Sequence, residues 1–327
     1  LETARGGILR RGLGVGEADG ALVSNISSDH LGEYGITTLE LMAEAKGMVY
    51  EAVREGGTKV YNIDDPYVAR LALRSGTDAV WTSLDGLSPK LKEHLEAGGR
   101  AVYLSEGSLF IARGSDSEVL MSVADIPCSF HGAARYNVAN ALSAVALAFS
   151  HGVSREAMRA GLSSFGTSWQ DNPGRGQLTE VNGIKVMLDF GHNPDGVKAL
   201  LDVIDGLLDT GEHRGRLSVC VGQAGDRSDQ DIFELAEAIT AGNPAKLYLR
   251  SMSGYLRGRE EGEVPRVFRE AFVKTGVASD IVSEVPDEVE ALKRAMSWAQ
   301  PGDLILHLVH LERESVETYL ADLGARI

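Results

Sequence analysis

Residues 177–194 read QLTEVNGIKVMLDFGHNP, and this stretch decides the fold of the second half of the chain. Asn182 and Gly183 lie between two apolar runs, which is the strongest short signal for a β-hairpin. The second run ends at Asp189, and Pro194 is suited to the first position of a helix. A strand that leads directly into a helix is typical of an α/β domain.

Strands and helices alternate on both sides of this hairpin, as the spacing of apolar residues indicates. Downstream, the pattern predicts strands at 217–221, 246–249 and 303–308 and a helix at 231–239. Upstream, it predicts strands at 21–23, 59–63 and 79–81, a helix at 39–53 that ends at the glycine pair 56–57, and a helix after Pro66. Residues 101–122 are typical of an antiparallel insertion at a sheet edge, and helices are expected at 137–151 and 155–165. The stretch 166–176 lacks an apolar period, so we place a boundary there between two α/β domains.

The composition limits the kinds of partner. The chain has 327 residues, 43% of them hydrophobic, and 47 Asp and Glu against 32 Lys and Arg give a formal net charge of −15. These values are typical of a globular protein with about two domains. Negative charge disfavours non-specific binding to nucleic acid or anionic membranes, and no apolar run reaches the ~18 residues of a membrane span. Cys128 and Cys220 are expected to be buried thiols. We therefore expect a cytoplasmic protein without a nucleic-acid or membrane partner.

Acidic and imidazole side chains follow the expected strands. Glu2 follows a suspected first strand, Asp29 and His30 follow the second, and Asp64 and Asp65 follow the next. Ligands of open α/β sheets bind at the carboxyl ends of strands, and a phosphate-bound Mg²⁺ needs only one or two carboxylates. The alternative is structural, because a histidine after a strand is often simply hydrogen-bonded.

Cationic side chains offer further candidates. Lys46 lies on the inner face of the expected helix. Either its aliphatic stem is buried and its ammonium group reaches water, or the lysine is chemically modified or faces a phosphate. Arg175 lies in a Pro-Gly-Arg-Gly hinge, which suits a phosphate clamp because a guanidinium offers a planar fork of donors; a solvated hinge arginine is the alternative. Asp226 and Arg227 follow another strand, but such pairs are common on surfaces.

Several well-known motifs do not occur in the sequence. It contains no G-x-x-x-x-G-K-[ST] loop, no G-x-S-x-G motif and no zinc-spaced His/Cys set. The glycines at 12–16 have no strand before them and do not form a dinucleotide fingerprint.

The motifs taken together resemble the Mur ligase superfamily, and within it the cyanophycin synthetase branch. The stretches that carry the resemblance are LETARGGILR (1–10), SNISSDHLG (24–32), NIDD (62–65), YNVANA (136–141), NPGR (172–175), DFGHNP (189–194), GDR (225–227) and LRGRE (256–260). They span essentially the whole chain in order. The resemblance implies a partial central domain of the P-loop type with a mostly parallel sheet (1–173), followed by a Rossmann-like C-terminal domain (174–327).

The resemblance also implies an activity. ATP would phosphorylate a carboxylate, an amine would attack the acyl phosphate, and an amide would form with release of ADP and phosphate. The partners would be an amino acid, arginine in this branch, and a peptide or polymer acceptor with aspartate side chains. ATP and Mg²⁺ would be required, and the full-length enzyme would be a homo-oligomer.

Roles for individual residues follow from the same resemblance. Glu2 and His30 would bind Mg²⁺, and Lys46 matches a lysine that is carbamylated in several members. The adenine side would be formed by Asn62, Asn137 and Asn140. Arg175 would reach the phosphates and Asp189 the ribose. His192, Asn193 and Arg227 would serve catalysis and substrate binding in a cleft that the last domain closes.

Two departures from the family pattern stand out. Phe190 occupies a position where the family usually has tyrosine, and the phosphate-binding loop that lies upstream of the Glu2 motif in the family is missing. We therefore expect the chain to be a fragment that does not turn over ATP alone. Two alternatives stay open: another Mur-type ligase acting on a peptidoglycan precursor, folate or glutamate chain, and a non-catalytic module that binds peptide or nucleotide.

Overall fold

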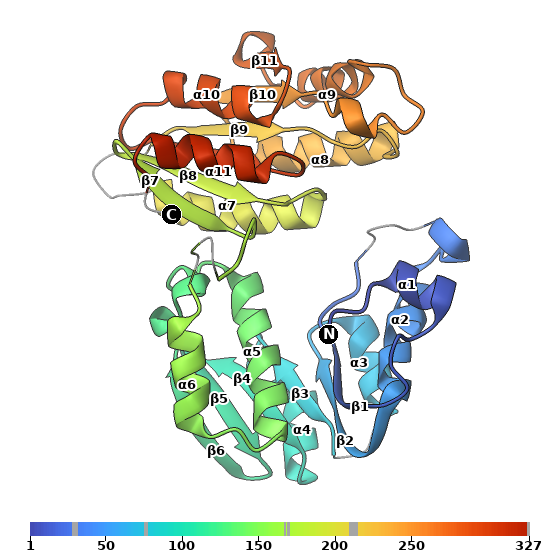
Figure 1. The fold of residues 1–327 in the computed structure, drawn as a ribbon. Helices are drawn as coiled ribbons and strands as arrows, with labels where there is room; N and C mark the ends of the chain where they lie inside the picture. Colours follow the sequence, from blue (N-terminus) through green and yellow to red (C-terminus); the bar gives the residue numbers. More distant parts are fainter. Residues whose placement is uncertain (28–31, 75–77, 167, 169–170, 209–214, 326–327) are drawn as a thin grey trace. The chain divides into compact units, whose positions relative to one another are not determined.

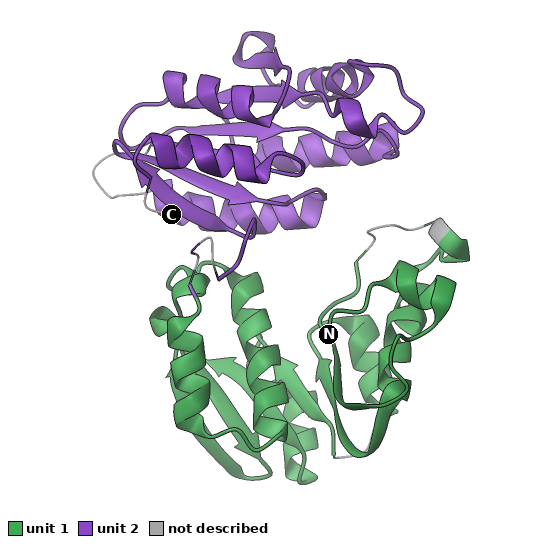
Figure 2. Cartoon of the chain, in the orientation of Figure 1, with its two compact units in different colours: residues 1–165 green, residues 166–327 purple. Residues whose placement is uncertain are grey.

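A computed structural model describes residues 1–27, 32–74, 78–166, 168, 171–208 and 215–325. The chain forms two compact units, Leu1–Phe165 and Gly166–Ile327 (Figure 2). Each unit contains one six-stranded sheet with helices (Figure 1). The predicted fold class, α/β with two mostly parallel sheets, is confirmed.

The sheet of the first unit follows the order of the chain. Its strands are β1 (Ala18–Val23), β2 (Val53–Asn62), β3 (Val80–Ser83), β4 (Arg100–Ser105), β5 (Ser108–Arg113) and β6 (Asp116–Ser122). Strands β1 to β4 are parallel, whereas β5 and β6 pair antiparallel at the edge. The expected antiparallel insertion at a sheet edge is therefore present.

Helices cover both faces of this sheet. Successive side chains of a strand point to opposite faces, so neighbouring residues pack against different helices. The helices are α1 (Arg5–Arg11), α2 (Leu39–Gly47), α3 (Pro66–Ala72), α4 (Pro89–Glu96), α5 (Arg135–Ser150) and α6 (Arg155–Ser164). Val60 and Val80 belong to a core cluster with residues of α5. Their neighbours Tyr61 and Trp81 belong to a second cluster with residues of α2, α3 and α4.

The prediction of one helix over 39–53 is wrong in its second half. Helix α2 ends at Gly47, a 3₁₀ turn follows at Met48–Ala52, and β2 already begins at Val53. The register between β1 and β2 shifts beside Gly56 and Gly57. Gly56 has a φ of 77°, and a Cβ on Gly57 would lie 2.8 Å from the carbonyl oxygen of Asp19. The glycine pair therefore permits a bulge within a strand rather than ending a helix.

The sheet of the second unit has the order β11-β10-β9-β12-β8-β7. Its strands are β7 (Gln177–Val181), β8 (Ile184–Asp189), β9 (Leu217–Val221), β10 (Lys246–Arg250), β11 (Val282–Val285) and β12 (Leu304–Leu308). The β7–β8 pair is the predicted antiparallel hairpin, and the other pairs are parallel. Asn182 and Gly183 have φ values of 52° and 78°, as a two-residue hairpin turn of this kind requires.

Two helical layers enclose this second sheet. The helices are α7 (Pro194–Leu208), α8 (Asp229–Ala241), α9 (Glu263–Lys274), α10 (Glu288–Trp298) and α11 (Arg313–Asp322). Residues of α10 and α11 share a core cluster with Leu188, Cys220 and Ile305. Helix α8 packs between α7 and α9, and every residue of β9 and β12 is buried, so these central strands are covered on both faces.

The two cysteines are buried and form no disulfide, as the sequence predicted. Burial raises the pKa of both thiols. Over the described residues, no helix combines the length and the apolar character that a bilayer crossing requires.

Candidate functional site at the end of strand β8

Asp189 is the last residue of β8 and ties two loops together. Its side chain is buried, and its Oδ2 and Oδ1 accept hydrogen bonds from the amides of Gly176, at 2.7 Å, and Gly191, at 2.6 Å. Burial raises the pKa of the carboxyl, while both amides and the charge of Arg175 act in the opposite direction. Asp189 therefore fixes the hinge segment that carries Arg175 against the end of the strand.

Phe190 is the ring around which the neighbouring side chains gather. The Arg175 guanidinium carbon lies 5.2 Å from the centre of the Phe190 ring, a distance typical of a cation–π contact. The rings of His192 and His310 meet the same ring edge-on at 5.6 and 4.9 Å. The structure therefore brings Arg175, Asp189 and His192 together at the carboxyl end of β8.

Asn193 forms the start of helix α7. Its Oδ1 accepts from the amide of Gly196 at 2.8 Å, and its carbonyl oxygen accepts from the amide of Val197 at 3.1 Å. The preceding carbonyl, that of His192, accepts from Nε2 of Gln223 at 2.8 Å. The first turn of α7, with its positive dipole end, therefore begins directly beside the cluster around Phe190.

Arg227 lies in the loop after β9, which β12 separates from β8 in the sheet. Its carbonyl oxygen accepts a hydrogen bond of 2.6 Å from the Arg259 guanidinium. The adjacent Asp226 pairs with Arg257 at 3.4 Å. The substrate-binding residue predicted here thus belongs to a second, neighbouring loop at the same edge of the sheet.

A buried polar network supports the Asp189 loop and was not predicted. Arg250 ends β10 with a fully buried side chain, and its Nη2 lies 2.8 Å from Oε1 of Glu288 and 2.6 Å from Nδ1 of His310. An arginine only donates hydrogen bonds, so Nδ1 of His310 accepts and Nε2 carries the proton. Nε2 lies 3.3 Å from the carbonyl oxygen of Gly191, which it reaches as a donor. The network therefore ends on the loop that carries Asp189 and His192.

This network keeps His310 neutral. Burial lowers the pKa of His310 to about 3, and the positive charge of Arg250 acts in the same direction. The sequence offered one signal for the network, because an arginine that closes the apolar run KLYLR (246–250) needs a buried partner. It did not indicate which residues would be those partners.

In the first unit, Lys46 and Asn62 bind the same segment after β1. Nζ of Lys46 lies 3.3 Å from the carbonyl oxygen of Asn25, and Nδ2 of Asn62 donates to the carbonyl oxygen of Ser24 at 2.8 Å. Lys46 is half-buried in the last turn of α2. These two predicted residues therefore lie on one segment at the carboxyl end of β1.

Asn137 and Asn140 lie near the start of α5. Asn137 is buried and donates from Nδ2 to the carbonyl oxygen of Cys128 at 2.7 Å, which holds the 3₁₀ turn Pro127–Ser129 against the helix. Asn140 is exposed, and its Nδ2 lies 3.5 Å from Oδ1 of Asn137. The two side chains meet, and the exposed one faces solvent.

Of the two predicted metal ligands, only Glu2 lies in the part of the chain that the structure describes. Glu2 is exposed in residues 1–4, which form no strand, and His30 lies outside the described residues. The carboxylate of Asp65 accepts from Ile26, Tyr67 and Val68, and that of Asp64 accepts from Ser83 and Leu84. Within the part of the chain that the structure describes, no group of three His, Cys, Asp or Glu side chains could hold a metal ion.

Two family models match the chain. The Mur ligase middle domain matches residues 2–148, and the Mur ligase glutamate ligase domain matches residues 174–308. The glutamate ligase domain match contains Arg175, Asp189, Phe190 and His192, and the middle domain match contains Lys46, Asn62, Asn137 and Asn140.

Curated relatives agree with these matches. The chain is 33% identical over 308 residues to the cyanophycin synthetase of Synechocystis sp., which covers 94% of this chain and 34% of that protein. It is 30% identical over 213 residues to the UDP-N-acetylmuramoyl-L-alanyl-D-glutamate–2,6-diaminopimelate ligase of Gloeobacter violaceus, covering 64% of this chain and 38% of that protein. The chain thus spans about a third of the length of these relatives.

Solved structures show the same fold. A pseudomurein peptide ligase type C from Methanothermus fervidus matches with a TM-score of 0.63 at 19% identity, over 94% of this chain and 64% of that one. The bifunctional folylpolyglutamate synthase/dihydrofolate synthase of Yersinia pestis, in complex with AMPPNP and Mn ion, matches with a TM-score of 0.61 at 19% identity, over 94% and 62%.

Proposed function

Because this chain belongs to the Mur ligase family and matches its middle and glutamate ligase domains, we propose that it forms part of an ATP-dependent, amide-forming ligase of the cyanophycin synthetase type. The observation that carries the proposal is the gathering of Arg175, Asp189 and His192 around Phe190, beside the first turn of α7. The relatives named cyanophycin synthetase, which match over nearly the whole of this chain, support the reaction class.

The proposed reaction has two steps. An oxygen of the acceptor carboxylate attacks the γ-phosphorus of ATP, the bond from that phosphorus to the bridging oxygen breaks, and ADP leaves. The amine then attacks the carbonyl carbon of the acyl phosphate, loses a proton, and expels inorganic phosphate as the amide forms. Phosphoryl transfer depends mainly on positioning and on neutralising charge, so the protein needs cationic and N–H donors rather than a covalent intermediate.

The residues of the second unit suit this demand. The Arg175 guanidinium is exposed and oriented by Phe190, so it can meet phosphate oxygens as a planar fork. The Asp189 oxygens each accept one amide hydrogen bond and keep a second lone pair, which suits a ribose hydroxyl. We assign His192 to catalysis and Asn193 and Arg227 to the amino-acid side.

Residues of the first unit complete the assignment. We place Asn62, Asn137 and Asn140 on the adenine side, and Lys46 as the carbamylated lysine. We assign residues 1–173 as the central, ATP-binding domain and residues 174–327 as the domain that presents the amino acid and closes over the site, where Arg175 and Asp189 also contact ATP.

For Mg²⁺ we propose Glu2 and His30. The described residues form no metal cluster by themselves. When bound, Mg²⁺ would neutralise phosphate charge. The Mn and AMPPNP named for the Yersinia pestis structure support a metal–nucleotide complex in a protein of this fold.

Several finer points belong to the same proposal. The amine donor is arginine and the acceptor is an aspartate side chain of a polymer. We place the whole natural protein in the cytoplasm as a homo-oligomer. We also propose that these 327 residues do not turn over ATP alone, since they contain no G-x-x-x-x-G-K-[ST] loop.

The test uses the whole natural protein with Mg-ATP, L-arginine and an aspartate polymer. ADP release that requires both substrates, with a mass gain of one arginine per amide, is the expected result. Arg175→Gln should lower kcat/KM about 100-fold, whereas Arg294→Gln, which removes an exposed arginine paired with Glu290, should leave it unchanged. Activity only with diaminopimelate or glutamate as amine donor would favour another Mur-type ligase. No Mg-ATP binding by calorimetry would favour a non-catalytic module.

A further inference from the structure

The loop after β9 and the segment after β10 touch through their backbones. We call residues 222–228 the β9 loop and residues 251–262 the β10 segment. The amide of Gly225 donates to the carbonyl oxygen of Tyr255 at 2.9 Å. A Cβ on Gly225 would lie 1.9 Å from the carbonyl oxygen of Leu256, so the contact leaves no room for any side chain there.

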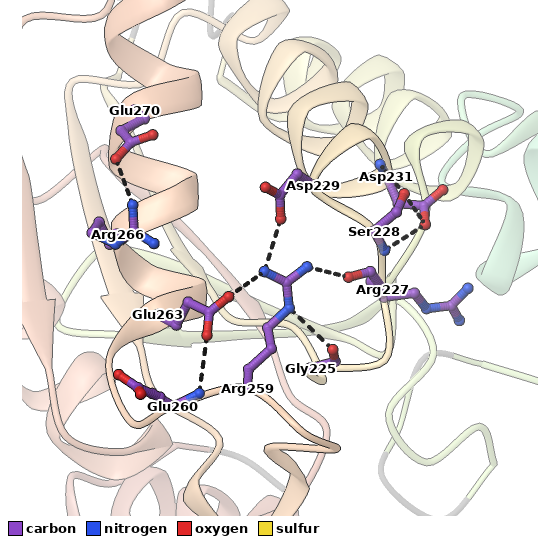
Figure 3. A network of polar contacts seen from close by, with 10 residues as sticks. All are labelled: Gly225, Arg227, Ser228, Asp229, Asp231, Arg259, Glu260, Glu263, Arg266 and Glu270. Carbon is purple, nitrogen blue, oxygen red and sulfur yellow. Dashed lines mark hydrogen bonds and ion pairs between the residues drawn. The ribbon is translucent and has the colours of Figure 1, made fainter.

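Arg259 joins the two at their centre (Figure 3). Its Nε donates to the carbonyl oxygen of Gly225 at 3.1 Å, and its Nη2 donates to that of Arg227 at 2.6 Å. Its Nη1 lies 2.8 Å from Oδ1 of Asp229 and 2.9 Å from Oε1 of Glu263. All three guanidinium nitrogens are therefore engaged, although the side chain keeps 15% of its surface exposed.

The β9 loop depends on this side chain for its shape. Two of its carbonyl groups point inward to one guanidinium, and the loop ends where a capping box of Ser228 and Asp231 starts α8. Figure 3 shows the Arg227 side chain directed away from the Arg259 guanidinium, while the Arg227 carbonyl points toward it. Arg259 thus fixes the backbone from which the Arg227 side chain projects.

A small pocket lies between the β9 loop and the β10 segment. Gln223 and Gly225 of the loop and Leu256 and Glu260 of the segment line it. It is at the carboxyl ends of parallel strands, where open α/β sheets bind ligands. Gln223 also donates to the carbonyl oxygen of His192 at 2.8 Å, so this pocket is connected to the cluster around Phe190.

We propose that Arg259 is a positioning residue for the amine donor: it holds the β9 loop so that Arg227 and the pocket wall meet the incoming amino acid. This inference rests on the proposed function. Arg259 touches no substrate in this role, because its nitrogens are occupied by the protein. Its contacts require a planar fork of donors, which lysine does not provide.

The experiment compares Arg259→Gln with Arg266→Gln in the whole natural protein. Arg266 is a matched control on the neighbouring helix α9, since its guanidinium forms an exposed pair with Glu270 at 2.9 Å. Arg259→Gln should raise the KM for the amine donor about tenfold or more, because small misplacements of a binding group are costly. The KM for ATP should stay within twofold of wild type, and guanidinium ion at a non-denaturing concentration should partly restore Arg259→Ala.

Hydrogen exchange provides the local measurement. Amides of residues 224–228 should exchange faster in Arg259→Gln than in Arg266→Gln, while those of β9 and β10 should not change. If exchange becomes faster throughout the unit, or if it does not become faster in the β9 loop, the positioning role is overturned. If the wild type is active and Arg259→Gln changes the KM for ATP and the KM for the amine donor equally, the positioning role is overturned as well. Absence of amide formation by wild type instead overturns the proposed function, on which the role depends.

Discussion

His307 makes the second unit sensitive to acid, and replacing it should remove part of that sensitivity. The residue lies in β12, between β8 and β9, with no exposed surface. Among the described residues, neither ring nitrogen has a hydrogen-bond partner. Burial, with the positive charge of Arg250 and the neighbouring His310, lowers the pKa of His307 to about 3. The folded protein therefore holds this ring neutral at any pH above about 4.

The magnitude follows from the difference between the folded and unfolded states. A histidine in an unfolded chain has a pKa of about 6.5. The pKa of His307 is lower in the folded state than in the unfolded state. The stability that the neutral ring contributes is therefore complete above the unfolded pKa and is lost progressively as the pH falls below the unfolded pKa. A pH of 5 lies about 1.5 units below the pKa of the unfolded histidine. Protonation therefore stabilises the unfolded chain relative to the folded one by about 2 kcal/mol, at 1.36 kcal/mol per unit. His310, whose pKa is lowered in the same way, adds a similar loss.

The assay is urea-dependent hydrogen exchange of peptides from β12, which gives the free energy of unfolding of this unit. Wild type and His307→Leu are compared at pH 7.5 and pH 5.0, so that the effects of all other titrating groups cancel. The variant should lose about 2 kcal/mol less than wild type over this interval. His131→Asn is the control, since His131 is exposed in the first unit with a φ of 57° that asparagine tolerates. If His307→Leu and wild type lose equal stability, within about 0.5 kcal/mol, the reasoning is refuted.

Three further substitutions test other contacts by urea unfolding at pH 7. Glu288→Gln removes a buried carboxylate that lies 2.8 Å from Arg250 and accepts hydrogen bonds from the amides of residues 310–312. The substitution should lower the free energy of unfolding by about 3–5 kcal/mol, and a loss below about 1 kcal/mol would contradict a buried ion pair. Gly225→Ala places a Cβ 1.9 Å from the carbonyl oxygen of Leu256 and should cost about 1–3 kcal/mol, so an unchanged midpoint would show that the loops move apart freely. Burial acts to raise the pKa of Asp303, but hydrogen bonds from Arg216 and from backbone amides outweigh burial and lower that pKa. The stability that the ionised carboxylate contributes to the fold is therefore complete above the unfolded pKa of about 3.9 and is lost at lower pH. Asp303→Asn should cost about 1.5–3 kcal/mol at pH 7 and reduce the loss of stability below pH 4, and equal acid sensitivity would argue against the pair.

Much of the fold could be predicted because its signals are local. The hairpin depends on Asn182 and Gly183, and the positive φ values of both residues confirm the prediction. The antiparallel strands near 101–122 were also predicted from short apolar runs and turns. The helix at 39–53 was wrong because apolar spacing continues through Met48–Ala52, while pairing with β1 draws the following residues into β2. That pairing is a tertiary effect, which overrides local propensity.

The candidate site could be predicted only where its parts are close in sequence. Arg175, Asp189 and His192 lie on one hinge and one strand end, and the structure places them around Phe190; their roles stay predictions. The network of Arg250, Glu288 and His310 joins residues from β10, from α10 and from the loop after β12. Which of them meet depends on the order of strands in the sheet, and the spacing of residues along the chain does not encode that order.

The placement of β12 also has a consequence for how the protein is made. The strands β8 and β9 are synthesised more than 80 residues before residues 304–308, which must later pair with both. Until that segment has left the ribosome, the nascent sheet keeps two unpaired apolar edges, which are templates for wrong association. A stop codon just before Leu304 would leave those edges open permanently, and such a product is expected to be a client of chaperones and proteases rather than a slightly shortened enzyme.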